Sequence, residues 1–174
     1  SGLYDYTVEF PDSFGEWAND AWETSVENVQ VIRWMNKQQT NGSSTVTWAD
    51  EPSAAGQWND GLPLPVIYEI VVESGSRPWL CVPHMADSSW ILAAANLFKD
   101  VPGVIWEYSN EVWNGQFSQH AWVGNNYGGG DPNLGYGIRA AQVSDLILSV
   151  DPDATFVLSS QNENPDVANQ ILTA

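Results

Sequence analysis

The chain has very few of the residues that build disulfides, metal clusters and basic surfaces. Its 174 residues include one cysteine, Cys81, with two histidines and five lysines or arginines. One cysteine excludes both an intrachain disulfide and a cysteine-based zinc cluster. Because Cys81 lies in the apolar run PWLCVP, we expect it to be a small buried hydrophobic residue.

The shortage of cations leaves the chain strongly acidic. Against the five Lys and Arg stand 22 Asp and Glu, which gives a formal net charge of -17. Binding to nucleic acid or to an anionic membrane normally needs clustered Lys and Arg, so we expect neither as a partner. Dispersed acidity suits a halophilic protein, because salt screens its self-repulsion. An acidic, secreted protein from an ordinary habitat is the alternative.

Long apolar segments are also missing. No run reaches the ~18 residues that a membrane-spanning helix needs, and nothing at the N-terminus reads as a signal peptide. The start at Ser1 and Gly2 leaves a processed or excised segment open, and we expect a secreted or extracellular protein. Hydrophobic residues make up 43% of the chain, which predicts a folded domain over residues 1–174.

What the chain does contain is a regular alternation of strand-like and helix-like segments. The strands are expected at residues 29–35, 77–83, 104–109 and 155–160. Helices are expected at residues 14–26, 63–74, 87–101, 117–127 and 136–150, with a last one starting at Asn164 or Asp166. The polar stretch 36–62 is too long for an ordinary turn, so we interpret it as a functional loop at the rim of the sheet.

This alternation predicts an α/β fold of parallel βα units, because a crossover helix between strands requires parallel pairing. Two architectures fit: a small doubly wound sheet, and about half of a (β/α)8 barrel, which typically needs ~250 residues when whole. The count of four strands favours the partial barrel, as does a final helix that runs to the chain end without a cap.

Strand carboxyl ends share one rim in any such sheet, so the residues that follow the strands should lie near one another. They are Trp34, Asn36 and Lys37, then His84 and Asp87, then Asn110, Glu111, Trp113 and Asn114, and last Gln161, Asn162 and Glu163. Aromatic faces stack on sugar CH groups, and amides bind hydroxyls. The rim therefore predicts a polysaccharide or oligosaccharide site, although most of the ten tryptophans are expected in the core.

The run WEYSNEVWN, residues 106–114, resembles the fourth-strand motif of the (β/α)8 glycoside hydrolase superfamily of cellulases, mannanases and β-galactosidases. In that motif an Asn directly precedes the acid/base Glu. Residues 32–52 and 77–90 look like a poorly characterised bacterial group described only as cellulose-binding or glycosidase-like. The similarity runs over most of residues 29–163.

The resemblance implies three catalytic positions. Glu111 would be the proton donor, Asn110 the partner of the sugar 2-hydroxyl, and His84 a neighbour of the acid/base. The substrate-binding residues would come from the same rim: Trp34, Asn36, Asp87, Trp113, Asn114, Gln161 and Glu163. From the residues alone, Glu111 could instead cap a helix or lie in solvent.

The chain also departs from that family. Retaining members take their nucleophile from a Glu on the seventh strand, and hydrolysis needs two carboxylates ~5 to 9.5 Å apart. Glu163 could substitute only in a compact fold, and Glu107 precedes Glu111 by ~13 Å of extended strand. Asp87 is more simply a helix cap. A half barrel would expose sheet edges, so we expect a homo-oligomer that completes the barrel.

The residues alone leave two other functions open. A noncatalytic carbohydrate-binding or scaffold protein would depend on its exposed tryptophans rather than on Glu111. A metal site could use His84, Asp87, Glu111 and His120, but their spacing matches no compact zinc or iron pattern. We therefore expect neither a metal nor a cofactor.

Overall fold

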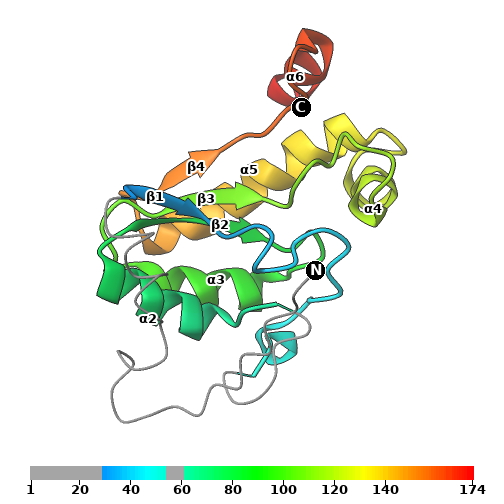
Figure 1. The fold of residues 1–174 in the computed structure, drawn as a ribbon. Helices are drawn as coiled ribbons and strands as arrows, with labels where there is room; N and C mark the ends of the chain where they lie inside the picture. The colour runs from blue at the N-terminus through cyan, green and yellow to red at the C-terminus, as the bar shows by residue number, and fades with distance from the viewer. Residues whose placement is uncertain (1–28, 54–60) are drawn as a thin grey trace, which may run out of the picture.

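The protein is a four-stranded parallel sheet with flanking helices, an α/β fold of parallel βα units (Figure 1). The computed structural model describes residues 29–53 and 61–174; the expected helix at 14–26 and part of the expected rim loop lie outside them. The strands are β1 (Val31–Arg33), β2 (Arg77–Val82), β3 (Ile105–Tyr108) and β4 (Thr155–Val157). All four expected strands are present, and each is shorter than its apolar run.

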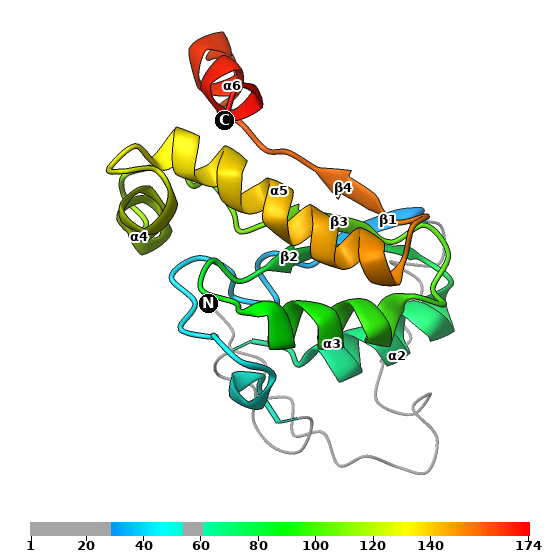
Figure 2. The ribbon, with the colours of Figure 1, turned by 180° about the vertical axis from the view of Figure 1, so that it is seen from behind.

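The strand order decides between the two architectures. The order is β1-β2-β3-β4, with parallel pairing throughout. A doubly wound sheet reverses direction at a switch point, whereas a (β/α) barrel adds each strand beside the last. Right-handed crossovers that all step one way place their helices on one face, as Figures 1 and 2 show from opposite sides. The described strands therefore have the arrangement of a partial barrel.

The helices begin and end where capping chemistry places them. The helix α2 (Leu64–Ser74) follows Pro63 and ends at Gly75, whose φ of 65° is readily reached by glycine. The Asp87 side chain caps α3 (Ser88–Phe98) by accepting a hydrogen bond from the Trp90 backbone N–H. These two helices cover β2 and β3 from the same side as the later helix that leads to β4.

Three helices follow β3. They are α4 (Ser118–Tyr127), α5 (Pro132–Val150) and α6 (Pro165–Leu172), and a short 3-10 helix, η2 (Trp48–Asp50), lies in the first long loop. The α5 helix begins four residues before the expected position, because Asp131 caps it and Pro132 occupies its first turn. No helix in residues 29–53 or 61–174 is both long and apolar enough to cross a membrane.

The two faces of the sheet have different chemistry, because successive side chains of a strand point to opposite faces. Leu80 and Trp106 point toward the helices, where the Trp106 and Phe98 rings meet edge to face at 6.0 Å. The opposite face carries Cys81 and Glu107, which are register partners on β2 and β3. A buried carboxylate therefore lies on the face that these helices leave uncovered.

Glu51 ties the long rim loop to two helices. Its Oε1 accepts a hydrogen bond from the Leu64 backbone N–H at 2.9 Å, and its Oε2 accepts one from Trp90 Nε1 at 2.8 Å. Pro63 provides no side-chain cap for α2, so Glu51 supplies the anion that this helix N-terminus favours. Burial raises the pKa of Glu51, and the two hydrogen bonds oppose that rise.

Candidate active site

The chain turns sharply where β3 ends, at the position predicted to carry the chemistry. Ser109 and Glu111 both have left-handed backbone conformations, with φ of 57° and 42°, although neither is glycine. Such conformations cost on the order of 1–3 kcal/mol and persist where surrounding contacts enforce them. They occur here on either side of Asn110, which is only 4% exposed.

Glu111 emerges from this turn half-buried, and Asn114 holds its carboxylate. Asn114 Nδ2 donates to Glu111 Oε2 at 2.9 Å, and the Asn114 backbone N–H donates to the Glu111 carbonyl at the same distance. Asn114 Oδ1 accepts from the Gln116 backbone N–H. The expected pair of rim residues Glu111 and Asn114 is thus brought together in a single turn.

Asn110 is held from three sides. Its Oδ1 accepts a hydrogen bond from Arg33 Nη2 at 3.0 Å, and its Nδ2 donates to Asn41 Oδ1 at 3.0 Å. Gln119 Nε2, from α4, donates to the Asn110 carbonyl at 2.8 Å and to Asn41 at 2.7 Å. The turn is therefore braced by β1, by the long loop and by α4.

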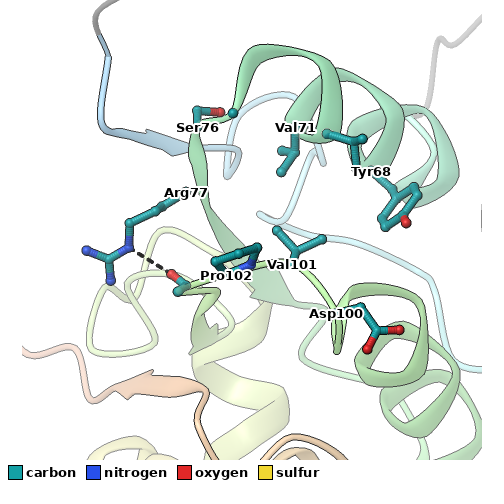
Figure 3. A pocket seen from close by; sticks show the side chains of 10 residues that line it. Tyr68, Val71, Ser76, Arg77, Asp100, Val101 and Pro102 are labelled. Carbon is teal, nitrogen blue, oxygen red and sulfur yellow. Dashed lines mark hydrogen bonds between the residues drawn. The ribbon is translucent and has the colours of Figure 1, made fainter.

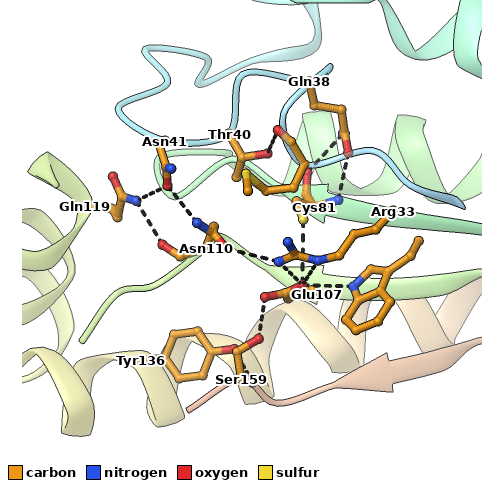
Figure 4. A network of polar contacts seen from close by, with 12 residues as sticks. Arg33, Gln38, Thr40, Asn41, Cys81, Glu107, Asn110, Gln119, Tyr136 and Ser159 are labelled. Carbon is orange, nitrogen blue, oxygen red and sulfur yellow. Dashed lines mark hydrogen bonds and ion pairs between the residues drawn. The ribbon is translucent and has the colours of Figure 1, made fainter. Parts of the chain in front are cut away.

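Glu107 is the centre of the buried polar network (Figure 4). Its Oε2 accepts from Arg33 Nε at 3.1 Å, from Arg33 Nη2 at 2.7 Å and from Trp79 Nε1 at 2.8 Å. The Cys81 thiol lies 3.8 Å from the same oxygen, and Ser159 Oγ donates to Oε1. With 1% exposure, this carboxylate relies on those donors in place of water.

Arg33 links the network to the turn. Its guanidinium also lies over the Trp79 ring, 5.1 Å from the centroid. Partial burial lowers the pKa of Arg33, but its hydrogen bond to Glu107 and the nearby acidic groups, Glu111 among them, hold that pKa above its ordinary value. Burial raises the pKa of the Cys81 thiol well above its usual range, so Cys81 is a neutral core residue as expected.

His84 follows β2 and is enclosed rather than open to solvent. It is 2% exposed, and its ring meets Trp122 of α4 edge to face at 5.3 Å. Its Nδ1 is buried without a hydrogen-bond partner among the described residues. Burial lowers the pKa of His84 to about 4, so the imidazole is neutral at neutral pH.

The other expected substrate residues lie in different settings. Trp34 is a core residue, 3% exposed, whereas Trp113 is partly buried. Asn36 is exposed, and Asp87 serves as the α3 cap, accepting from the Trp90 backbone N–H at 3.0 Å and from Ser89 Oγ at 2.6 Å. Beyond β4, Gln161 Oε1 accepts from Asn164 Nδ2, and Glu163 is exposed.

The chain between Glu107, in β3, and Glu111, after it, is not fully extended. The expected ~13 Å between Glu107 and Glu111 assumed a straight strand, but β3 ends at Tyr108 and the chain turns at Ser109. Both Glu107 oxygens are already engaged by donors. The part of the chain that the structure describes holds no group of three or more His, Cys, Asp or Glu suited to a metal ion.

A groove of about 530 Å³ lies at the opposite end of the sheet (Figure 3). Tyr68 and Val71 of α2 form one wall, and the loop 100–103 forms the other. Arg77, the first residue of β2, donates from Nε to the Gly103 carbonyl at 3.0 Å at its edge. Parallel sheets place their chemistry at the carboxyl ends of the strands, so this groove is not our candidate site.

Sequence reasoning missed Arg33, Asn41 and Gln119, which brace the turn, and Ser159, which donates to Glu107. One signal was available: Glu107 lies in an apolar strand, and a buried carboxylate needs a cation and hydrogen-bond donors. Arg33 is one of only five basic residues and lies at a strand end. Pairing the two would have identified the centre of the network.

Comparisons of this chain with protein-family models, with curated proteins and with solved structures find no match.

Proposed function

We propose that this is a glycoside hydrolase-like protein, which binds a polysaccharide at the carboxyl edge of its sheet and uses Glu111 as the general acid/base. The turn at residues 109–111 carries the proposal. Its two left-handed, non-glycine residues keep Asn110 buried and leave Glu111 half-buried at the strand end. Strained residues held in this way are concentrated at active sites.

The proposed chemistry needs a carboxyl group that can reach a glycosidic oxygen. A general acid must come within hydrogen-bond reach of the atom that it protonates, and the partial exposure of Glu111 supports such access. Asn114 fixes the direction of the carboxylate. Trp113, next but one along the chain and partly buried, is the proposed stacking surface for a sugar ring.

Glycoside hydrolysis also needs a second carboxylate. Glu107 does not suit that role, because Arg33, Trp79 and Ser159 occupy both of its oxygens. We propose that a second copy of the chain supplies the missing acid by pairing at the outer strands β1 and β4, which have one partner each among the described strands. With a net charge of -17, such pairing should strengthen as salt rises.

A panel of soluble polysaccharides tests the proposal. The wild type should release reducing ends from at least one of them, and Glu111→Gln should bind that glycan with unchanged affinity but lose turnover. The rate of reducing-end release per chain should rise with protein concentration, together with the dimer fraction measured by light scattering. Absence of reducing ends across the panel, in both low and high salt, contradicts a hydrolytic function.

A second candidate is a noncatalytic carbohydrate-binding protein, favoured by the full engagement of Glu107. In that case Trp113→Ala should abolish glycan binding in affinity electrophoresis. Glu111→Gln should then leave every measured property unchanged. Because Trp113 also stacks on the sugar in the proposed hydrolase, Glu111→Gln is the variant that separates the hydrolase from the binding module.

A further inference from the structure

The planar guanidinium of Arg33 contacts two different residues. Its Nε and Nη2 both point at Glu107 Oε2, and the same Nη2 lies 3.0 Å from Asn110 Oδ1. The guanidinium is therefore shared between a buried carboxylate on β3 and the turn that follows the same strand (Figure 4). Glu107 precedes the turn, so it anchors Arg33 without being part of the turn.

We infer that Arg33 and Glu107 are a positioning pair that sets the direction of the Glu111 carboxylate by holding Asn110. The inference rests on the proposed function for its kinetic consequence. Neither residue needs to touch the substrate, because Glu107 holds Arg33 and Arg33 holds the Asn110 side chain in the turn at residues 109–111.

The geometry explains why a carboxylate and an arginine occupy these positions. Trp79 and Ser159 fix Glu107 from two further directions, so the carboxylate presents Oε2 to the guanidinium in one orientation. The planar guanidinium of Arg33 then donates a second, rigidly placed N–H to Asn110 Oδ1. The flexible ammonium of lysine cannot make both contacts in this fixed geometry. Asn41 and Gln119 hold the remaining side of Asn110 but carry no charge.

Steady-state kinetics on the cleaved polysaccharide test the pair. Arg33→Lys keeps the positive charge but loses the fork, and its kcat should fall about 100-fold because the acid is misplaced. Its KM should stay within about threefold of the wild-type value, because the contacts that bind the substrate equally in the ground state and the transition state are kept. Arg77→Lys makes the same chemical change at the opposite end of the sheet, where Arg77 Nε donates to the Gly103 carbonyl, so it is the matched control and should retain near wild-type kcat.

Crystal structures of wild type and Arg33→Lys give a readout that does not depend on activity. The variant should show Glu111 moved away from its left-handed conformation and its bond to Asn114 broken. An unchanged turn, an unchanged kcat, or equal losses in Arg33→Lys and Arg77→Lys would each overturn the inference. A wild type without turnover contradicts the proposed function alone, and the crystal comparison then decides the positioning role. If Arg33→Lys does not fold, Glu107→Gln, which keeps size and one acceptor, is tested in the same way.

Discussion

Arg33 and Glu107 are 74 residues apart in the chain, yet Nη2 of the one lies 2.7 Å from Oε2 of the other. The pair joins β1 to β3 across β2, on the face of the sheet that α2, α3 and α5 do not cover. It brings one of the chain's few cations to its most deeply buried carboxylate among the described residues. The turn at residues 109–111 begins two residues after that carboxylate.

Removing the cation should destabilise the fold. Arg33→Met leaves Glu107 buried and unpaired, so the free energy of unfolding should fall by about 3 kcal/mol, as for other broken buried pairs. Urea unfolding at neutral pH measures this change. The double variant Arg33→Met/Glu107→Met should be more stable than Arg33→Met, because no uncompensated charge remains. If the loss in the double variant equals the sum of the losses in Arg33→Met and Glu107→Met, the two side chains do not interact energetically, which would contradict the ion pair's contribution.

Glu51 should matter for stability although it lies in the long loop. Glu51→Ala leaves the Leu64 N–H and Trp90 Nε1–H without their acceptors, and both residues are 1% exposed. The free energy of unfolding should fall by about 2 kcal/mol. Glu51→Gln keeps one acceptor oxygen and should lose less. Equal stability of wild type and Glu51→Ala in urea would show that these two hydrogen bonds contribute nothing to stability.

Asp87 tests whether an expected substrate residue is a helix cap. Asp87→Ala should lower the thermal midpoint, whereas Asp87→Asn should preserve most of it, because an amide oxygen also accepts from the Trp90 N–H. Its hydrogen bonds to Ser89 and Trp90 hold the pKa of Asp87 below its ordinary value. The stabilising contribution of Asp87 should therefore be lost only as the pH falls below about 4. A substrate role predicts weaker glycan binding in both variants at unchanged stability.

His84 should make the protein sensitive to mild acid. Its pKa of about 4 in the folded chain lies below the ordinary value of 6.5, so the unfolded chain takes up the proton first. The His84 contribution should lower stability by on the order of 2 kcal/mol as the pH drops from 6.5 to 4, and it should not change further below pH 4. Urea midpoints across this range measure it.

The control for that measurement is His84→Phe. The phenyl ring keeps a partner for the Trp122 ring but does not titrate. The variant should show a flatter pH dependence between 6.5 and 4. If wild type and His84→Phe lose stability in parallel, another group is responsible.

Much of the fold could be predicted from local sequence. The Asp87 cap, the Gly75 stop and the apolar runs at residues 77–83 and 104–109 are encoded by neighbouring residues, and the structure has them where they were expected. Four strands with intervening helices also required parallel pairing. The consecutive strand order was not determined by these local signals, because two architectures satisfy them.

The candidate site was less predictable. Its two acidic positions, Glu107 and Glu111, are evident in the motif, but the turn between them needs left-handed serine and glutamate, against their local preferences. Long-range partners enforce that turn: Arg33 comes from β1 and Gln119 from α4. Local sequence carries no information on such contacts, so the straight-strand spacing of the two carboxylates was the wrong assumption.

If Glu111 donates the proton to the leaving group, as we propose, its loss should matter most where the leaving group needs a proton. Rates of wild type and Glu111→Gln should be compared on the cleaved polysaccharide and on a dinitrophenyl glycoside of the same sugar. We expect Glu111→Gln to lose at least about 100-fold on the polysaccharide and much less on the dinitrophenyl glycoside, whose leaving group needs no proton. Equal losses on both substrates, or no loss on either, would contradict this role of Glu111.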